Sequence, residues 1–339
     1  MCPVTRVVDE DHRGHSSAAK YIETVVTHPA HSGIVEASHG ARQSARGSPC
    51  YARVHVISES QRESYEAEGV VLIEQAFAPE WVARLTLAFD RLQSLIRTGQ
   101  PLPHCGDAAL RKADGDFDAR TGRAHLRNAA PHDPDVHAWA MRSPAADLVA
   151  GLLGVSTVQL WYDLWFCKEA GGGVDAATPW HHDSVGHCFE GPHIPSLWIA
   201  LSDVGPDDAP LLTLQGSHRD PRLFPPPYRP GKEHLPLAEG YTPIEVMQAE
   251  VAAQAARIRV WTVRSGDCLL IHPQTWHASL PQRSSVRRRL ACTSRWLGTD
   301  LRFQPRPYSF NGYYHGADSL SIGARPPYDF LPSLVRSIS

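Results

Sequence analysis

Two histidines and one aspartate in this sequence have the types and spacing of a metal-binding set. His181 and Asp183 lie two residues apart in the segment TPWHHDSVGH, directly after a predicted strand, so that in an extended chain both side chains point to the same side. A third ligand is expected from SGDCLLIHPQTWHASL, where a strand and a short turn precede His277. Two histidines and one carboxylate on one face of an octahedron bind non-haem iron(II) and leave positions open for a bidentate 2-oxo acid and dioxygen.

Other residues in the sequence could be mistaken for these metal ligands. A second H-x-D pattern, His218 and Asp220 in GSHRD, begins a Pro-rich segment instead of following a strand. His272 lies at a predicted strand end, where a structural histidine is the usual interpretation. His182 lies between the two predicted ligands and should point away from the metal, because successive side chains of a strand point to opposite faces.

A run of three arginines, Arg287, Arg288 and Arg289, follows His277 along the chain. Because side chains alternate along a strand, the face that carries Arg287, Arg289 and Arg295 is expected in solvent, whereas the face that begins with Arg288 continues into apolar residues and is expected inside. A buried arginine requires an anionic partner, and a dicarboxylic acid supplies one through a bidentate pair. Arg288 is therefore the predicted anchor of such an acid.

The elements that must position these residues change in character along the chain. Helices are predicted in the first half, over residues 58–68, 79–98 and 143–154, with a strand over 70–73. The first helix has a capping box at Ser58 and Gln61 and is ended by Gly69. From Thr157 onward, short strands rich in Trp, Val, Ile and Leu alternate with clusters of Gly, Pro and Asp, which indicates an antiparallel sandwich or barrel.

Composition favours one elaborated domain. The 339 residues are 42% hydrophobic and include nine Trp, and the formal net charge of -3 creates no strong field, so nucleic acid and anionic membranes are not expected partners. The seven Cys form no C-x-x-C pair and are interpreted as reduced thiols. Without an apolar stretch of the length of a signal or a membrane span, a cytoplasmic location is expected.

Residues 1–53 are predicted to be a disordered tail, since they are rich in Ser, His, Ala and Gly without a sustained period. Residues 54–335 are predicted to form a single domain. A Pro-rich insertion at about 219–257 is too long for a hairpin turn. Its length is compatible with a lid or binding loop and equally with a surface loop that has no role in binding.

Several motifs follow one another in a defined order: S-x-x-Q-R-E-S-Y-E-A-E-G-V-V-L-I, WFCKEAGG followed by TPWHHD, LWIALSDV, PLLTLQGSH, and GDCLLIHPQTWHAS with Arg288. In this order, over residues 58–298, the chain resembles the phytanoyl-CoA dioxygenase family of iron(II)/2-oxoglutarate oxygenases. The resemblance implies a mainly β fold with flanking helices, a double-stranded β-helix barrel of the jelly-roll, cupin-like kind. It also implies iron(II) as the metal, 2-oxoglutarate and dioxygen as cosubstrates, and support of activity by ascorbate.

Carried over by position, the resemblance makes His181, Asp183 and His277 the iron ligands. It makes Arg288 the partner of the C5 carboxylate of 2-oxoglutarate. The further positions that the resemblance assigns to the cosubstrate are Trp198, Leu164 and Lys168. The alternatives are core packing for the first two and a solvated turn lysine for the third.

Two departures from the family concern its usual residues near the ligands. His182 stands where the family often has Gln, and Gln282 stands in the loop after His277, where the family often has Asn. The altered loop leaves Arg287 as an alternative to Arg288.

The implied reaction is hydroxylation of a C–H bond in a small-molecule metabolite, with conversion of 2-oxoglutarate and dioxygen to succinate and carbon dioxide. Halogenation is disfavoured because Asp183 occupies the position that related halogenases leave small. A cupin-like metal-binding protein or isomerase and a zinc hydrolase remain as alternatives, but neither needs the buried arginine. The substrate and the oligomeric state are not legible in the sequence, because one fold serves many reactions.

Overall fold

The computed structural model describes residues 56–103, 114–118, 122–172, 177–227, 236–309, 320–325 and 336–337. The predicted disordered tail, residues 1–53, lies outside this part of the chain. Most of the described regular structure is antiparallel β, with helices at the periphery, as the sequence predicted. None of the described helices is long and apolar enough to cross a membrane.

The larger of the two main sheets runs in the order β1-β10-β7-β12-β4-β3-β2, with β14 also paired to β4. Its strands are β1 (Val70–Ile73), β2 (Asp114–Asp118), β3 (Arg123–Arg127), β4 (Thr157–Lys168), β7 (Ser196–Ala200), β10 (Cys268–Ile271), β12 (Arg289–Leu297) and β14 (Arg336–Ser337). All these pairings are antiparallel. The sheet therefore places β12 between β7 and β4, although the three strands are far apart in the sequence.

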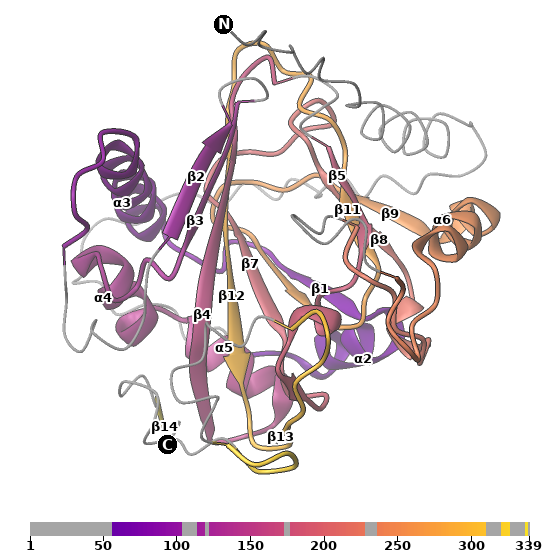
Figure 1. Ribbon diagram of the computed structural model, residues 1–339. Helices are drawn as coiled ribbons and strands as arrows, with labels where there is room; N and C mark the ends of the chain where they lie inside the picture. Colours follow the sequence, from indigo (N-terminus) through magenta and orange to yellow (C-terminus); the bar gives the residue numbers. More distant parts are fainter. Residues whose placement is uncertain are drawn as a thin grey trace, which may run out of the picture.

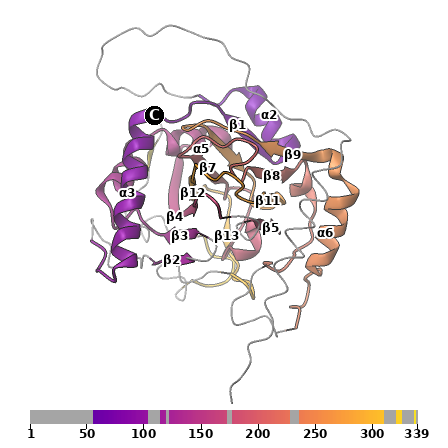
Figure 2. The ribbon, with the colours of Figure 1, turned by 90° about the horizontal axis from the view of Figure 1, so that it is seen from above.

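The smaller main sheet has the order β5-β11-β8-β9. Its strands are β5 (Thr178–His181), β8 (Leu211–Leu214), β9 (Ile258–Trp261) and β11 (His277–Ser279). A short separate pair is formed by β6 (Phe189–Glu190) and β13 (Arg302–Phe303). Figure 1 shows the smaller sheet opposite the larger one, and the view from above in Figure 2 places α3 outside the larger sheet and α6 outside the smaller.

The described helices are α2 (Glu59–Glu68), α3 (Pro79–Arg97), α4 (Pro134–Arg142), α5 (Ala145–Leu153) and α6 (Ile244–Ala253). The predicted capping box is present, since the Ser58 hydroxyl accepts from the Gln61 backbone N–H and the Gln61 side chain accepts from the Ser58 N–H. Gly69 ends α2 with φ of +79°, and a Cβ there would overlap the side chains of Thr275 and His218, so glycine is required at this position. The helices α4 and α6 were not predicted from the sequence.

Both faces of the larger sheet are buried, and this decides which side chains reach the site. One face of β12 carries Leu290 and Cys292, which belong to the apolar cluster that also contains residues of α3, α4 and α5. The opposite face carries Ala291, which packs with Trp198 of β7 and Trp261 of β9. Because the two faces are equally enclosed, solvent exposure does not distinguish them along β12.

The described part of the predicted insertion packs on the smaller sheet. Phe224, Met247 and Val251 are buried in one cluster with side chains of β5 and β8. Arg222 joins the two halves of this segment through an ion pair to Glu250 at 2.7 Å. The described residues of the insertion thus form a cover on the outer face of the strands that carry the candidate ligands.

Candidate active site

His181, on β5, and His277, on β11, are direct partners in the register of the smaller sheet. Their ring centroids lie 4.2 Å apart. The Nδ1 of His181 donates to the carbonyl oxygen of Pro179 at 2.8 Å, and that of His277 donates to Thr275 at 2.9 Å. This tautomer leaves the lone pair of each Nε2 available for a metal, with each ring oriented by a backbone carbonyl.

Asp183 completes the group from the first position of the 3-10 helix η3 (Asp183–Gly186). Its Oδ1 lies 4.0 Å from Nε2 of His181 and 3.9 Å from Nε2 of His277. The three ligand atoms all lie within 4.8 Å of one another, and no second such group of His, Cys, Asp or Glu occurs in the described part of the chain. The donor set fits a divalent transition metal such as iron(II).

The electrostatics keep His181 and Asp183 in the protonation states of metal ligands. Burial, reinforced by the charge of His277, lowers the pKa of His181 to about 3, so that its imidazole is neutral at physiological pH. Burial alone would raise the pKa of Asp183, but the neighbouring charge of Arg295 reverses this effect and holds the pKa well below its usual range. The aspartate is therefore ionised although its side chain is only 15% exposed.

The competing histidines lie elsewhere. The ring of His272 contacts that of His218 at 5.1 Å and Tyr65 at 6.0 Å, and neither histidine belongs to the candidate metal group. His182 points away from the group, as predicted: its Nδ1 hydrogen-bonds with the Ser184 hydroxyl at 2.8 Å, and its Nε2 accepts from the Phe224 backbone N–H at 3.1 Å. His182 thereby attaches the insertion to the turn that carries Asp183.

The structure corrects the predicted orientation of the three arginines. Arg288 does not face the barrel interior. It forms a bidentate ion pair with Asp90 of α3, at 2.7 and 2.9 Å, on the helical side of the sheet. Arg287 likewise pairs with Asp208, at 2.6 Å. Arg289, which was predicted to face solvent, is only 3% exposed. The prediction was wrong because the apolar parity of β12 packs under the helices, whereas the polar parity lines the interior.

Arg289 and Lys168 form a pair of buried cations beside the candidate metal group. They are direct partners in the register of β12 and β4, and each is 3% exposed. The Nζ of Lys168 donates to the hydroxyl of Ser279 at 2.5 Å and to that of Thr178 at 3.3 Å. Among the described residues, neither cation has a carboxylate partner, and the guanidinium of Arg289 makes no hydrogen bond to another side chain or to the backbone.

Because both cations are buried without a neighbouring anion, the pKa of each is lowered. Burial lowers the pKa of Arg289 to about 10. Burial, together with the charges of Arg289 and Arg123, lowers the pKa of Lys168 well below its usual range. An anionic ligand placed between Arg289 and Lys168 would reverse both effects.

The other two positions assigned to the cosubstrate by resemblance lie in the same region. The guanidinium carbon of Arg289 is 5.2 Å from the centroid of the Trp198 ring. Trp198 and Leu164 are both direct partners of Thr293, across β7 and β4 respectively, so that they share the interior face of the sheet. Trp198 and Lys168 therefore lie beside Arg289 and not Arg288, and Leu164 lies further along the same face of the sheet.

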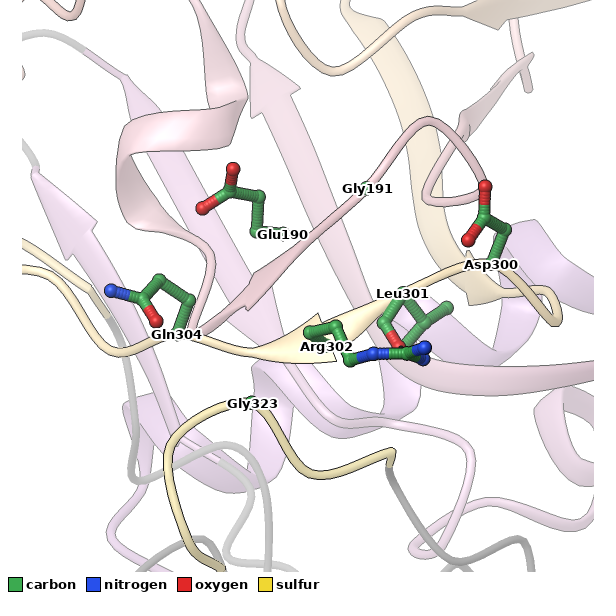
Figure 3. Close-up of a pocket in the computed structure, with 7 residues that line it drawn as sticks. All are labelled: Glu190, Gly191, Asp300, Leu301, Arg302, Gln304 and Gly323. Carbon is green, nitrogen blue, oxygen red and sulfur yellow. The ribbon is translucent and has the colours of Figure 1, made fainter.

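A separate shallow depression of about 430 Å³ lies over the short β6 and β13 pair. Figure 3 shows its lining, which includes Glu190, Asp300 and Arg302. It contains none of the candidate ligands and neither of the buried cations. We therefore do not assign the chemistry to it.

The family model described as phytanoyl-CoA dioxygenase (PhyH) matches residues 65–290. The chain belongs to the phytanoyl-CoA dioxygenase family. This places it among the iron- and 2-oxoglutarate-dependent non-haem oxygenases. No curated protein is similar enough in sequence to match.

Solved structures of phytanoyl-CoA dioxygenase-like enzymes share the fold. The 2-oxoglutarate-dependent carbocyclase SnoK from nogalamycin biosynthesis has a TM-score of 0.58 at 17% identity, with 83% of this chain and 96% of that chain covered. The epimerase SnoN, in complex with Fe3+, 2-oxoglutarate and nogalamycin RO, has a TM-score of 0.56 at 20% identity, covering 81% and 98%. EctD from S. alaskensis has a TM-score of 0.53 at 19% identity, covering 73% and 79%. The predicted double-stranded β-helix fold is confirmed.

Sequence reasoning missed three residues that the structure brings to the site: Arg289, Arg295 and Ser196. The available signal was the polarity of one face of β12, where two arginines and Thr293 alternate with apolar residues. In a barrel whose interior binds a metal and a polar ligand, the polar face belongs inside. To place the polar face of β12 inside, one must know that helices cover its other face, and the sequence of β12 alone does not show this.

Proposed function

We propose that this chain is an iron(II)/2-oxoglutarate-dependent oxygenase that hydroxylates a C–H bond of a small-molecule metabolite. In this proposal His181, Asp183 and His277 hold the iron. Arg289, in place of the originally predicted Arg288, binds the C5 carboxylate of 2-oxoglutarate. The observation that carries the proposal is a buried arginine without an anionic partner among the described residues, inside a barrel of the phytanoyl-CoA dioxygenase family that also carries a His-Asp-His group.

The charges of the site support a dicarboxylate cosubstrate. The charge of Asp183 is balanced by Arg295, whose Nη2 lies 2.5 Å from its Oδ2, whereas no carboxylate in the described part of the chain balances the charge of Arg289. A buried, unpaired guanidinium is costly in free energy, and a carboxylate removes this cost through charge-assisted hydrogen bonds. One end of 2-oxoglutarate supplies that carboxylate, and its 2-oxo acid end is a chelator suited to the open positions of the metal.

The remaining residues have defined roles in this proposal. Iron, when bound, supplies the oxidising chemistry that couples conversion of 2-oxoglutarate and dioxygen to succinate and carbon dioxide with oxidation of the substrate. Lys168 donates a second hydrogen bond toward the C5 carboxylate, beside the hydroxyls of Ser279 and Thr178 that now hold it. Trp198 and Leu164 form the apolar wall that excludes water from this end of the cosubstrate.

The proposal also specifies the type of reaction at the substrate carbon, which is hydroxylation. The solved structures that share the fold include a carbocyclase and an epimerase, which at 17% and 20% identity have only the fold in common with this chain. Hydroxylation, ring closure and epimerisation begin from the same oxidising site, so the site does not choose among them. Incorporation of one oxygen atom from 18O2 into the product is the observation that separates hydroxylation from the other two.

The test is a screen of small-molecule substrates with iron(II), ascorbate and 2-oxoglutarate, read as succinate formation and oxygen consumption. Asp183→Ala serves as the matched inactive control. We expect succinate formation that depends on both iron and 2-oxoglutarate, and a basal rate even without the true substrate. A protein that binds no 2-oxoglutarate when loaded with iron, and turns over none of it, would overturn the proposal and favour a non-oxygenase cupin-like protein.

A further inference from the structure

The two carboxylate oxygens of Asp183 have different surroundings. Oδ1 faces the ring nitrogens of His181 and His277, at 4.0 and 3.9 Å. Oδ2 faces the opposite way and accepts hydrogen bonds from Nη2 of Arg295 at 2.5 Å and from the hydroxyl of Ser196 at 3.1 Å. One oxygen is therefore turned toward the histidines, and the other is fully engaged by the protein.

The two donors come from paired positions of neighbouring strands. Arg295 on β12 and Ser196 on β7 are direct register partners, so that both side chains leave the same face of the larger sheet. The Arg295 side chain is 5% exposed, and its guanidinium carbon lies 5.8 Å from the centroid of the Tyr162 ring. The clamp is thus part of the rigid sheet and not of a surface loop.

Thr293 binds the terminal nitrogen of Arg295 that does not reach Asp183. A free guanidinium pairs with a carboxylate through two parallel hydrogen bonds that occupy both oxygens. Here Nη1 of Arg295 donates to the Thr293 hydroxyl at 2.5 Å, while only Nη2 reaches Asp183. The threonine therefore occupies the second terminal nitrogen and orients the guanidinium so that Nη2 alone contacts Asp183, while Nε has no partner among the described residues and Oδ1 is left free.

We propose that Arg295, held by Thr293 and assisted by Ser196, is a positioning residue that makes Asp183 a one-oxygen metal ligand. By engaging Oδ2, it denies the metal a bidentate carboxylate and keeps a coordination position for the 2-oxo acid. It also balances the ligand charge, so that the protein groups of the metal site are together neutral. This inference rests on the proposed function, since it concerns the same metal.

The first experiment uses Thr293→Val, which keeps shape and removes the hydroxyl acceptor. With Nη1 released, Arg295 can pair with both oxygens of Asp183 and compete with the metal. We expect the affinity for Co(II) alone, titrated into metal-free protein, to fall about tenfold, at the lower end of the roughly ten- to hundredfold effect typical of residues that orient ligands. Thr293→Ser restores the acceptor and should restore the affinity.

The second experiment compares Arg295→Met with Arg289→Met, each loaded with Fe(II) without oxygen. Chelation of 2-oxoglutarate by the metal is read from the visible metal-to-ligand charge-transfer band. Arg295→Met should reduce the amplitude of the band at saturating 2-oxoglutarate, because Asp183 can use both oxygens. Arg289→Met should leave the full amplitude but require more 2-oxoglutarate to reach it. Arg295→Lys, which keeps the charge but not the two-armed hold, should be intermediate in amplitude.

Circular dichroism and thermal unfolding of each metal-free variant verify that it is folded. If Arg295→Met does not fold, the Co(II) titration of Thr293→Val is the deciding measurement. Unchanged Co(II) affinity in Thr293→Val, or a full band with unchanged half-saturation in Arg295→Met, overturns the inference. The proposed function fails separately, if the wild-type protein binds Fe(II) but shows no band with 2-oxoglutarate. The Co(II) titration needs no cosubstrate, so the two failures are distinguishable.

Discussion

Replacing Arg289 by Gln or Met is the most informative single change in this protein. Arg289 is 3% exposed and has no carboxylate partner among the described residues. In the bound state it is proposed to pair with the C5 carboxylate of 2-oxoglutarate. Loss of a charge-assisted pair of this kind costs about 1.5 to 3 kcal/mol, which corresponds to a rise of about tenfold to 150-fold in the apparent KM for 2-oxoglutarate.

The same substitution should have the opposite effect on the protein without cosubstrate. The buried guanidinium of Arg289 is desolvated, as its pKa of about 10 indicates, and nothing in the described structure balances it. Arg289→Met removes this cost while keeping an unbranched apolar stem, so the free energy of unfolding should rise, on the order of 1 to 3 kcal/mol. Greater stability together with weaker cosubstrate binding is the signature of an anchor that is strained without its ligand.

Arg288→Gln is the matched control. Its ion pair with Asp90 joins side chains that are 33% and 45% exposed, and exposed pairs contribute about 0 to 1 kcal/mol. The apparent KM for 2-oxoglutarate should change by less than about twofold. Succinate formation against 2-oxoglutarate concentration measures the KM, and denaturant titration measures the stability. A large rise in KM for Arg288→Gln with little change for Arg289→Gln would refute the reasoning and restore the assignment made from the sequence.

Further predictions concern the histidines. His181→Ala or His277→Ala should each nearly abolish iron binding, measured as bound Fe(II) per chain, because each removes a ligand of the group. His182→Ala should retain iron but lose about 1 to 3 kcal/mol of stability, because the Phe224 N–H loses its buried acceptor; loss of iron in this variant would contradict the orientation seen here. Burial, together with the charge of His218, lowers the pKa of His272 to about 4, so its unfolded form takes up protons below its ordinary pKa of about 6.5 before the folded form does. Stability should therefore fall with pH below about 6.5, by about 2 kcal/mol at pH 5 from this residue alone, and urea titrations of His272→Gln should show that much less acid sensitivity.

The sequence was sufficient for the fold class and for the elements with strong local signals. The capping box at Ser58, the stop at Gly69 and the strand rhythm after Thr157 are consequences of local physics, and the structure confirms them. The helix α6 escaped prediction because its apolar residues Met247 and Val251 lie inside a segment dominated by proline, and it is stabilised by packing on the smaller sheet. Tertiary contacts of that kind leave little trace in a local pattern.

In the candidate site, too, some residues could be predicted from local sequence and others could not. The three proposed ligands were selected from spacing and from their positions after strands, and the structure brings their ligand atoms within 4.8 Å of one another. The arginine was selected from an exposure argument, which assumes that one face of the strand is in solvent. That assumption fails for a strand in the middle of a layered sheet, where β12 is buried at all nine positions. Register with β4 and β7 then decides orientation, and register is not visible in the sequence of one strand.

Strand geometry links the two arginine assignments. Arg289 and Arg295 are separated by an even number of positions on β12, so a regular strand places both side chains on one face. The irregularity in the pairing with β4 lies beyond them, between Arg295 and Trp296, and does not disturb this relation. A shift of one residue would turn both arginines away from the interior together. The contact of Arg295 with Asp183 therefore also places Arg289 inside, whereas Arg288, of the other parity, cannot reach the interior while Arg295 holds Asp183.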